Sequence, residues 1–227
     1  MTFSTHRHLA FDKDQEVEIK FIYNEIFVQE DYQIQLESEQ PVIVDCGANI
    51  GFASLYFSEK YPNAKIIAFE PNPSSVMYFN KNTQGLQESG NLKLYQVALG
   101  EENSLSHFYT TKHAASAMGS LVFAFKGHKI PVQVKKLSEY LTVYNRIDLV
   151  KIDIEGSEWE VTRDLISSGT IKKIDQILVE YHQESNTPNR LAEFIKLYEH
   201  AGFDVTIRRT IDVKIFVCSV LHCKRKN

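Results

Sequence analysis

An acid and two glycines follow a short apolar run in the stretch "VIVDCGANIGFAS", in the order Asp45, Gly47 and Gly51. Glycines at this place after a buried strand let the backbone come close to a small polar ligand at the start of a helix. The pattern D-x-G-x-x-x-G differs from the G-x-G-x-x-G pattern of dinucleotide sites, and no lysine or arginine occurs at positions 41–59. Since the carboxylate of Asp45 would repel a pyrophosphate, the loop favours a ligand with an ammonium group and no phosphate.

A second acid, Glu70, ends the next apolar run, "KIIAFE". In this kind of topology an acid at that position reaches the ribose hydroxyls of a nucleoside ligand, and its two oxygens can accept both O–H groups. S-adenosylmethionine carries an ammonium group, a sulfonium and such a ribose. The glycine loop and Glu70 therefore point to S-adenosylmethionine as the cofactor and not to a nicotinamide dinucleotide.

Three residues that could act on an acceptor follow two later apolar runs. Asp153 and Glu155 lie at the end of "IDLVKIDIE", and His182 ends "QILVEYH". Asp153 could bind the cofactor or position the acceptor, and a histidine that titrates near neutral pH could take the proton of a hydroxyl. The alternatives are a turn-capping acid, a first-turn acid that complements a helix dipole, and a solvated loop histidine. Glu180 is expected to point to a different face from His182.

The same three residues, Asp153, Glu155 and His182, could in principle bind Mg²⁺ or a similar hard cation and activate a hydroxyl. Their spacing fixes no more than two of them on one side of the chain. The sequence therefore predicts no metal site, and no effect of a chelator on activity.

The elements that must position these residues alternate along the chain. Short β-branched runs at 41–45, 65–70, 92–99, 147–154 and 176–182 suit buried strands, and helical patterns at 51–61, 72–82, 157–166 and 187–202 separate most of them. Asn72, Thr187 and Ser157 are expected as helix caps, with Ser157 and Glu160 forming a capping box. The last two strand-like runs, 203–209 and 213–221, are too close for a helical crossover, so they predict an antiparallel hairpin. The sum is an α/β fold with a mostly parallel, doubly wound sheet.

Two segments do not fit the alternation. Residues 1–40 precede the first strand, and we interpret them as an N-terminal cover segment on a domain that spans 41–227. Residues 105–140 contain small residues, histidines and strand-like pieces without a long helical pattern. An insertion there lies near the carboxyl ends of the sheet, so it is expected to be a lid or substrate wall, with an ordinary crossover plus a hairpin as the alternative.

The composition is that of a globular protein without a polyanionic partner. The chain has 227 residues, 43% hydrophobic and 24% charged, with a formal charge of -4, so nucleic acid is not favoured as a partner. It has no apolar signal region at the N-terminus and no run approaching the roughly 18 apolar residues of a membrane span. Cys46, Cys218 and Cys223 are odd in number and lack metal-ligand spacing. We therefore expect a cytoplasmic protein with free thiols, no membrane association and a small-molecule acceptor; the oligomeric state cannot be read from the sequence.

The stretches "VIVDCGANIGFAS", "AFEPNP", "QVALG" and above all "DLVKIDIEGSEWEV" together resemble the FkbM-type methyltransferases, a branch of the S-adenosylmethionine-dependent class I enzymes. The likeness runs from about Glu25 to about Phe203, and D-[IV]-E-G-x-E is its specific part. The resemblance implies a Rossmann-like, seven-stranded sheet. It also implies methyl transfer, usually to oxygen, in sugars, polyketides or other secondary metabolites. The acceptor is left open, as are N-methylation and an inactive methyltransferase-like binding module.

The resemblance also assigns roles to individual positions. It implies that Asp45, Gly47 and Gly51 contact the methionine end of the cofactor, Glu70 the ribose, and the segment from Ala98 to Glu101 the adenine edge. The full set of expected cofactor-binding residues is Asp45, Gly47, Ala48, Asn49, Gly51, Glu70, Pro71, Ala98, Leu99 and Asp153. The expected catalytic residues are Asp153, Glu155 and His182.

Overall fold

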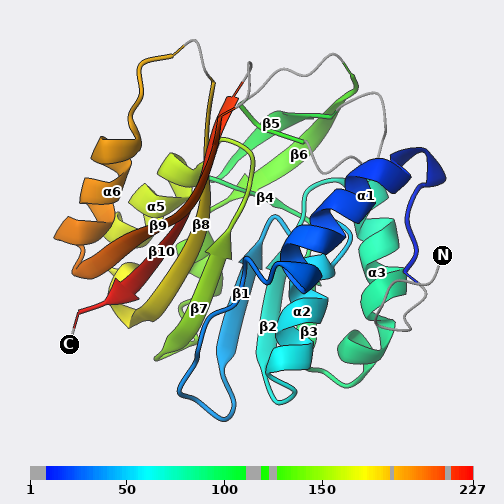
Figure 1. The fold of residues 1–227 in the computed structure, drawn as a ribbon, viewed down its shortest axis with the longest axis horizontal. Helices are drawn as coiled ribbons and strands as arrows, with labels where there is room; N and C mark the ends of the chain where they lie inside the picture. Colours follow the sequence, from blue (N-terminus) through cyan, green and yellow to red (C-terminus); the bar gives the residue numbers. More distant parts are fainter. Residues whose placement is uncertain (1–8, 111–118, 123–126, 185–186, 213–215, 227) are drawn as a thin grey trace.

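The computed structural model describes residues 9–110, 119–122, 127–184, 187–212 and 216–226, and its centre is a seven-stranded sheet (Figure 1). In spatial order the strands are β3 (Leu92–Tyr95), β2 (Lys65–Phe69), β1 (Val42–Cys46), β7 (Ile147–Ile152), β8 (Ile174–Glu184), β10 (Phe216–Arg225) and β9 (Phe203–Asp212). The pairs from β3 to β8 are parallel, whereas β10 is antiparallel to both β8 and β9. The predicted doubly wound sheet with its antiparallel C-terminal hairpin is confirmed.

Helices cover both faces of this sheet. One face carries α1 (Glu16–Tyr23), α2 (Phe52–Lys60) and α3 (Pro73–Glu88), and the other carries α4 (Leu137–Tyr140), α5 (Glu158–Ser167) and α6 (Leu191–His200). Short turns of helix are η1 (Lys13–Gln15), η2 (Asn24–Val28) and η3 (Thr170–Lys173). Ile43 packs toward the first helical layer and Val44 toward the second, both fully buried. Because these strands are buried on both faces, their sequences are almost continuously apolar.

The run at 92–99 is not one strand, as the sequence predicted, but two. After β3 the chain turns, with the Val97 N–H donating to the Tyr95 carbonyl at 3.0 Å, and Ala98–Leu99 becomes β4 of a separate sheet. That sheet has three strands, and β6 (Lys129–Lys135) lies between β4 and β5 (Ser104–Tyr109). Within the 105–140 insertion, residues 105–109 and 129–135 belong to this small sheet, while residues 111–118 and 123–126 lie outside the described residues.

Two predicted helix starts differ from the structure. At α5, Ser157 makes no capping hydrogen bond with its side chain; instead the Glu158 carboxylate accepts from the Gly156 N–H at 3.0 Å. The α6 helix begins at Leu191 and not after Thr187, whose hydroxyl donates to the Glu184 carbonyl at 2.7 Å. At α3 the prediction is confirmed, since Asn72 Oδ1 accepts from the Ser74 N–H at 3.0 Å.

The segment before β1 is tied to the C-terminal hairpin and to α2. The guanidinium of Arg209 in β9 lies 2.6 Å from a carboxylate oxygen of Glu25 and 2.8 Å from one of Asp31. The hydroxyl of Tyr61, just after α2, donates to the Ile34 carbonyl. These contacts hold the segment between α1 and β1 against β9 and against the end of α2.

The described helices are too short or too polar for any of them to span a bilayer. Cys46, Cys218 and Cys223 are buried free thiols.

Candidate active site

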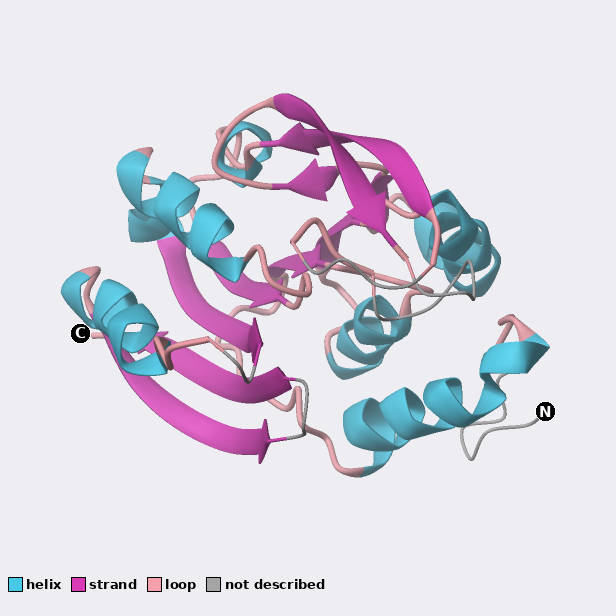
Figure 2. Ribbon diagram, turned by 90° about the horizontal axis from the view of Figure 1, so that it is seen from above, coloured by secondary structure: helices cyan, strands magenta, loops and turns pink. Residues whose placement is uncertain are grey.

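A cavity of about 360 Å³ lies above the carboxyl ends of β1, β2, β7 and β8. The strand order reverses between β1 and β7, and this switch point is where ligands bind in open α/β sheets. Figure 2, seen from above, shows α1 near the N-terminus and the three-stranded sheet as separate parts of the molecule, and residues of both line the cavity. The volume falls within the range of small-molecule pockets, roughly 300–1,000 Å³.

The glycine loop forms one wall. Gly47 has φ 79°, and a Cβ there would lie 1.7 Å from the carbonyl oxygen of Asp153, so only glycine fits. The N–H groups of Gly47 and Ala48 donate to the Phe69 carbonyl at 3.0 and 2.9 Å, which joins the loop to the end of β2. Gly51 has φ 97° and precedes α2, but it does not line the cavity. Its role in this structure is to turn the chain into the helix.

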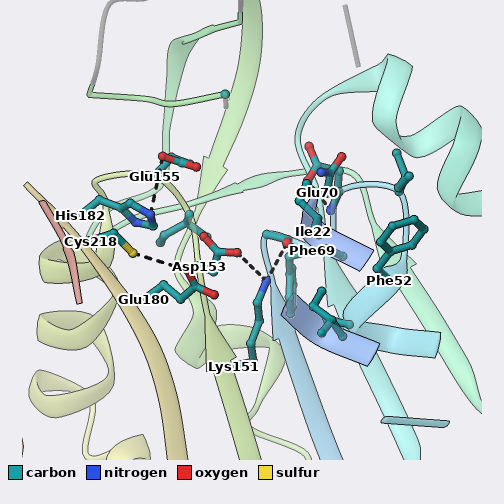
Figure 3. Close-up of a pocket in the computed structure, with 18 of the residues that line it drawn as sticks. Ile22, Phe52, Phe69, Glu70, Lys151, Asp153, Glu155, Glu180, His182 and Cys218 are labelled. Carbon is teal, nitrogen blue, oxygen red and sulfur yellow. Dashed lines mark hydrogen bonds and ion pairs between the residues drawn. The ribbon is translucent and has the colours of Figure 1, made fainter. Parts of the chain in front are cut away.

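Glu70 lies at one end of the cavity with Phe69 (Figure 3). Its side-chain oxygens accept from the backbone N–H groups of Asn49 and Asn72, both at 2.9 Å, and only 6% of the residue is exposed. Burial raises the pKa of Glu70 to about 7, although those hydrogen bonds and the charge of Lys151 act in the opposite direction. The predicted neighbours Ala48, Asn49, Pro71, Ala98 and Leu99 all line the cavity.

Asn49 gives this end of the cavity a further polar group. Its side-chain Oδ1 is buried and accepts no hydrogen bond from any described residue, and Asn49 lines the cavity. An orphaned acceptor beside a buried carboxylate suits a ligand rich in O–H and N–H donors. The residues present at this end therefore fit a nucleoside.

The position of Asp45 differs from the expected one. Its side chain is fully buried below the loop, accepts from the Ser54 hydroxyl at 2.7 Å, and does not line the cavity. Strands on both sides of β1 and the start of α2 enclose it. In this structure the acid supports the loop from below, and its expected contact with the methionine end of the cofactor stays a prediction.

Lys151 is a cavity residue that the sequence interpretation missed. Its ammonium donates to the carbonyls of Gly47 (2.8 Å) and Cys46 (3.3 Å) and lies 3.4 Å from an oxygen of Asp45 and 3.3 Å from one of Asp153. The parallel pairing of β1 with β7 places Asp45 beside Lys151. A basic group thus lies at the loop although none occurs in it. A lysine in the middle of an otherwise apolar strand was the available signal.

Asp153, Glu155 and His182 gather at the other end of the cavity, together with Glu180 and Cys218 (Figure 3). Asp153 carries 26% of its side-chain surface exposed and pairs with Lys151. Glu155 has φ 55°, a left-handed conformation that is costly for a residue with a side chain and is typical of functional sites. The predicted catalytic residues are therefore neighbours in space.

His182 lies between two carboxyl groups, and its role as proton acceptor stays a prediction. Its Nδ1 lies 3.0 Å from Glu158 Oε1 and its Nε2 lies 3.8 Å from Glu155 Oε2. Burial disfavours the charged imidazole, but Glu155, a hydrogen bond with Cys218 and the contact with Glu158 outweigh it and raise the pKa of His182 well above its usual value. The raised pKa favours the protonated imidazole over the neutral form that a proton acceptor requires.

Two carboxyl groups beside His182 titrate closer to neutral pH. Burial raises the pKa of Glu155 to about 8, against the opposing charge of His182. Burial and the charge of Asp153 raise the pKa of Glu180 to about 7. The expectation that Glu180 points to another face is wrong, because residues two apart in a strand share a face and both Glu180 and His182 line the cavity.

The donor atoms of Asp153, Glu155 and His182 lie within 4.8 Å of one another, and so do those of Glu180, His182 and Cys218. The structure thus brings together three candidate metal ligands that the spacing in the sequence alone does not place on one side. A metal on His182 would have to displace the proton that the neighbouring carboxylates stabilise, since a metal binds the neutral imidazole. That no metal acts here remains a prediction.

The fold and this site define the class of protein. A sheet in which an antiparallel last pair follows five parallel strands, with a cavity at the switch point, is that of class I methyltransferases that use S-adenosylmethionine. The sequence profile of the family described as "Methyltransferase FkbM domain" matches residues 45–205. The chain belongs to this FkbM family of S-adenosylmethionine-dependent methyltransferases.

Relatives agree with this assignment. Methyltransferase 1 of Beauveria bassiana is 32% identical over 214 residues, which cover 85% of this chain and 84% of that protein. Methyltransferase sdnD of Sordaria araneosa is 30% identical over 235 residues, 87% of each chain. The 2-O-methyltransferase NoeI of Sinorhizobium fredii is 26% identical over 168 residues, 66% of each.

Among solved structures, a methyltransferase FkbM from Methylobacillus flagellatus superposes with a TM-score of 0.57 at 12% identity. The match covers 88% of this chain and 47% of that one. At this identity the likeness supports the fold.

Proposed function

We propose that the protein transfers a methyl group from S-adenosylmethionine to a hydroxyl of a small molecule such as a sugar, a polyketide or another secondary metabolite. The observation that carries the proposal is the set of three carboxyl groups, Asp153, Glu155 and Glu180, at the end of the cavity away from Glu70. A hydroxyl must lose its proton as it is methylated, whereas a neutral amine can attack first and lose a proton afterwards. Carboxyl groups with pKa values of about 7 and 8 are suited to exchange a proton with a hydroxyl near neutral pH. A relative named as a 2-O-methyltransferase adds support.

The cofactor, when bound, supplies a methyl carbon activated by its sulfonium. In our proposal Glu70 and the loop from Gly47 to Asn49 hold the nucleoside, with Pro71, Ala98 and Leu99 along the base. Asp153, at the end of the cavity away from Glu70, binds the methionine end or the acceptor. The protein's main task is then to align the acceptor and exclude water, for which Phe108 and Leu121 of the insertion line the cavity on one side and α1 on the other.

We expect Asp153→Asn to lower kcat/KM by about tenfold or more, which is at least about 1.4 kcal/mol of transition-state stabilisation. The substitution keeps the shape of the side chain and removes its charge, so the melting temperature should change little. Steady-state kinetics and thermal unfolding check this. A shifted melting temperature with normal turnover would instead mark a structural acid.

We also expect no loss of activity with a chelator; loss with recovery on adding Mg²⁺ or Mn²⁺ would show that a metal acts at these residues.

We expect the affinity for S-adenosylhomocysteine to rise as the pH increases through about 7. Glu70 is largely protonated below that pH, and only its carboxylate can accept from two ribose hydroxyls at once. Binding below pH 7 should therefore release a proton, which calorimetry in buffers of different ionisation enthalpy measures. Glu70→Gln should lose this pH dependence; an equal dependence in both proteins would assign it to another group.

A panel of acceptors tests the function directly. 4-Nitrophenyl glycosides, hydroxylated polyketides and matching amines would each be incubated with S-adenosylmethionine, and S-adenosylhomocysteine measured by a coupled assay. The proposal expects turnover with hydroxyl compounds. Turnover with the amines alone would favour N-methylation, and tight cofactor binding without turnover on any acceptor would favour a binding module.

We infer a small-molecule partner and action in the cytoplasm, which the three buried free thiols support, since such thiols suit a reducing compartment.

A further inference from the structure

Tyr32, from the N-terminal segment, reaches the carboxyl groups at the acceptor end of the cavity. Its hydroxyl donates to Glu180 Oε1 at 2.6 Å and lies 3.4 Å from Asp153 Oδ2. The residue is 5% exposed, and its ring stacks on Phe57 at 6.2 Å with Lys151 5.8 Å from the ring centre. Burial and these two contacts hold the Tyr32 hydroxyl in one place.

Glu180 differs from the neighbouring acids in its partners. Asp153 pairs with Lys151 at 3.3 Å, and Glu155 lies 3.8 Å from His182. Among the described residues no cation lies within 4.0 Å of the Glu180 carboxylate, which accepts instead from Tyr32 and, at 3.6 Å, from the Cys218 thiol. Neutral donors therefore fix the Glu180 carboxylate in place without a direct ion pair, and its oxygens face the cavity.

We propose that Glu180 is the catalytic residue that accepts the acceptor's proton, and that Tyr32 is the positioning residue that holds it. The inference rests on the proposed O-methylation. As the acceptor oxygen bonds to the methyl carbon, the carbon–sulfur bond breaks with its electron pair going to sulfur, and the hydroxyl proton passes to Glu180. The sulfonium charge and the carboxylate charge disappear together, so the step balances without another reactant.

The titratable and charged groups around Glu180 come from six parts of the fold. Tyr32 faces it from the N-terminal segment, Lys151 and Asp153 from β7 and its end, Glu155 from the following loop, His182 from β8 itself, and Arg209 and Cys218 from β9 and β10. Burial and Asp153 raise the pKa of Glu180, while His182, Tyr32 and Lys151 act against them. Removal of the Tyr32 hydroxyl should therefore raise this pKa further.

The N-terminal segment is then part of the catalytic site and not just a cover. Arg209 pairs with Glu25 and Asp31, which precede Tyr32 in the chain. The Tyr61 hydroxyl donates to the carbonyl of Ile34, which follows Tyr32. Tyr61 supplies a matched control, because its hydroxyl fixes the same segment from outside the cavity.

The experiment compares the full-length protein with Glu180→Gln, Tyr32→Phe and Tyr61→Phe. Infrared difference spectra over pH 5–9 follow the carboxylic acid C=O band, and turnover is measured over the same range with a hydroxylated 4-nitrophenyl glycoside. Glu180→Gln should remove one titration near pH 7 and lower kcat by about 100-fold or more, with binding of S-adenosylhomocysteine retained. Tyr32→Phe should move that titration, and the rising limb of the pH–rate profile, upward by roughly 0.5–1 pH unit.

Tyr61→Phe should lower the melting temperature and leave both pH profiles in place. An unchanged infrared titration in Glu180→Gln, or turnover within threefold of the parent, would remove Glu180 from the role. Equal titrations in the parent and Tyr32→Phe would remove Tyr32. The infrared measurement needs no acceptor, so it tests the titration of Glu180 and its dependence on Tyr32 even if the proposed O-methylation is wrong.

Discussion

Replacing Lys151 by methionine is expected to lower the free energy of unfolding by about 3–5 kcal/mol, the cost of leaving a buried charge without its partner. Lys151 is 2% exposed and Asp45 is fully buried, and the substitution leaves the Asp45 carboxylate with the Ser54 hydroxyl as its remaining contact. The carbonyls of Cys46 and Gly47 lose a donor at the same time. Urea unfolding, monitored by tryptophan fluorescence and circular dichroism, measures the change.

Two variants make this result specific. Asp45→Asn combined with Lys151→Met removes both charges and should recover part of the loss, because the cost comes from an unpaired buried ion. Lys136→Met is the matched control: its ammonium lies 3.7 Å from the buried Asp164, but it is 34% exposed and Asp164 also accepts from Ser138, so the effect should stay under about 1 kcal/mol. Equal losses for Lys151→Met and Lys136→Met would contradict the account of the loop.

Glu70→Ala is expected to weaken the binding of S-adenosylhomocysteine by about 1–3 kcal/mol, or roughly 5- to 150-fold, because the ribose hydroxyls lose a charged acceptor. The substitution also removes the acceptor of the Asn49 and Asn72 N–H groups. Isothermal titration calorimetry measures the affinity, and thermal unfolding measures any loss of stability.

Asp148→Ala is the matched control for Glu70→Ala. Asp148 is 5% exposed and accepts from the Val42 N–H at 2.8 Å, so it too is a buried acid that satisfies backbone, but it does not line the cavity. It should lower stability and leave the affinity for S-adenosylhomocysteine unchanged. Parent-like affinity in Glu70→Ala would show that the ribose lies elsewhere.

The features that the sequence predicted well are those carried by neighbouring positions. Buried strands, the hairpin and the glycine loop each occupy one short stretch, and the positive φ of Gly47, 79°, is the backbone conformation for which glycine is favoured. Glu70 was found because it ends the strand next to β1. These are local patterns whose physical cause is also local.

The features that were missed depend on pairing between distant segments. Lys151 meets Asp45 through the register of β1 and β7, and Tyr32 meets Glu180 across the fold. The charge of His182 depends on Glu155, Glu158 and Cys218, which come from three different elements. No spacing along the chain reports such neighbours. The exception is Glu180, whose place beside His182 follows from the two-residue repeat of a strand.

The most direct test of O-methylation is the position of the transferred methyl group. The protein would be incubated with S-adenosylmethionine labelled with ¹³C in its methyl group and with a 4-nitrophenyl glycoside of an amino sugar, which offers hydroxyls and an amine on one ring. Carbon NMR of the product distinguishes a methoxy carbon from an N-methyl carbon. We predict a methoxy signal, absent in Glu180→Gln. An N-methyl signal as the sole product would contradict O-methylation.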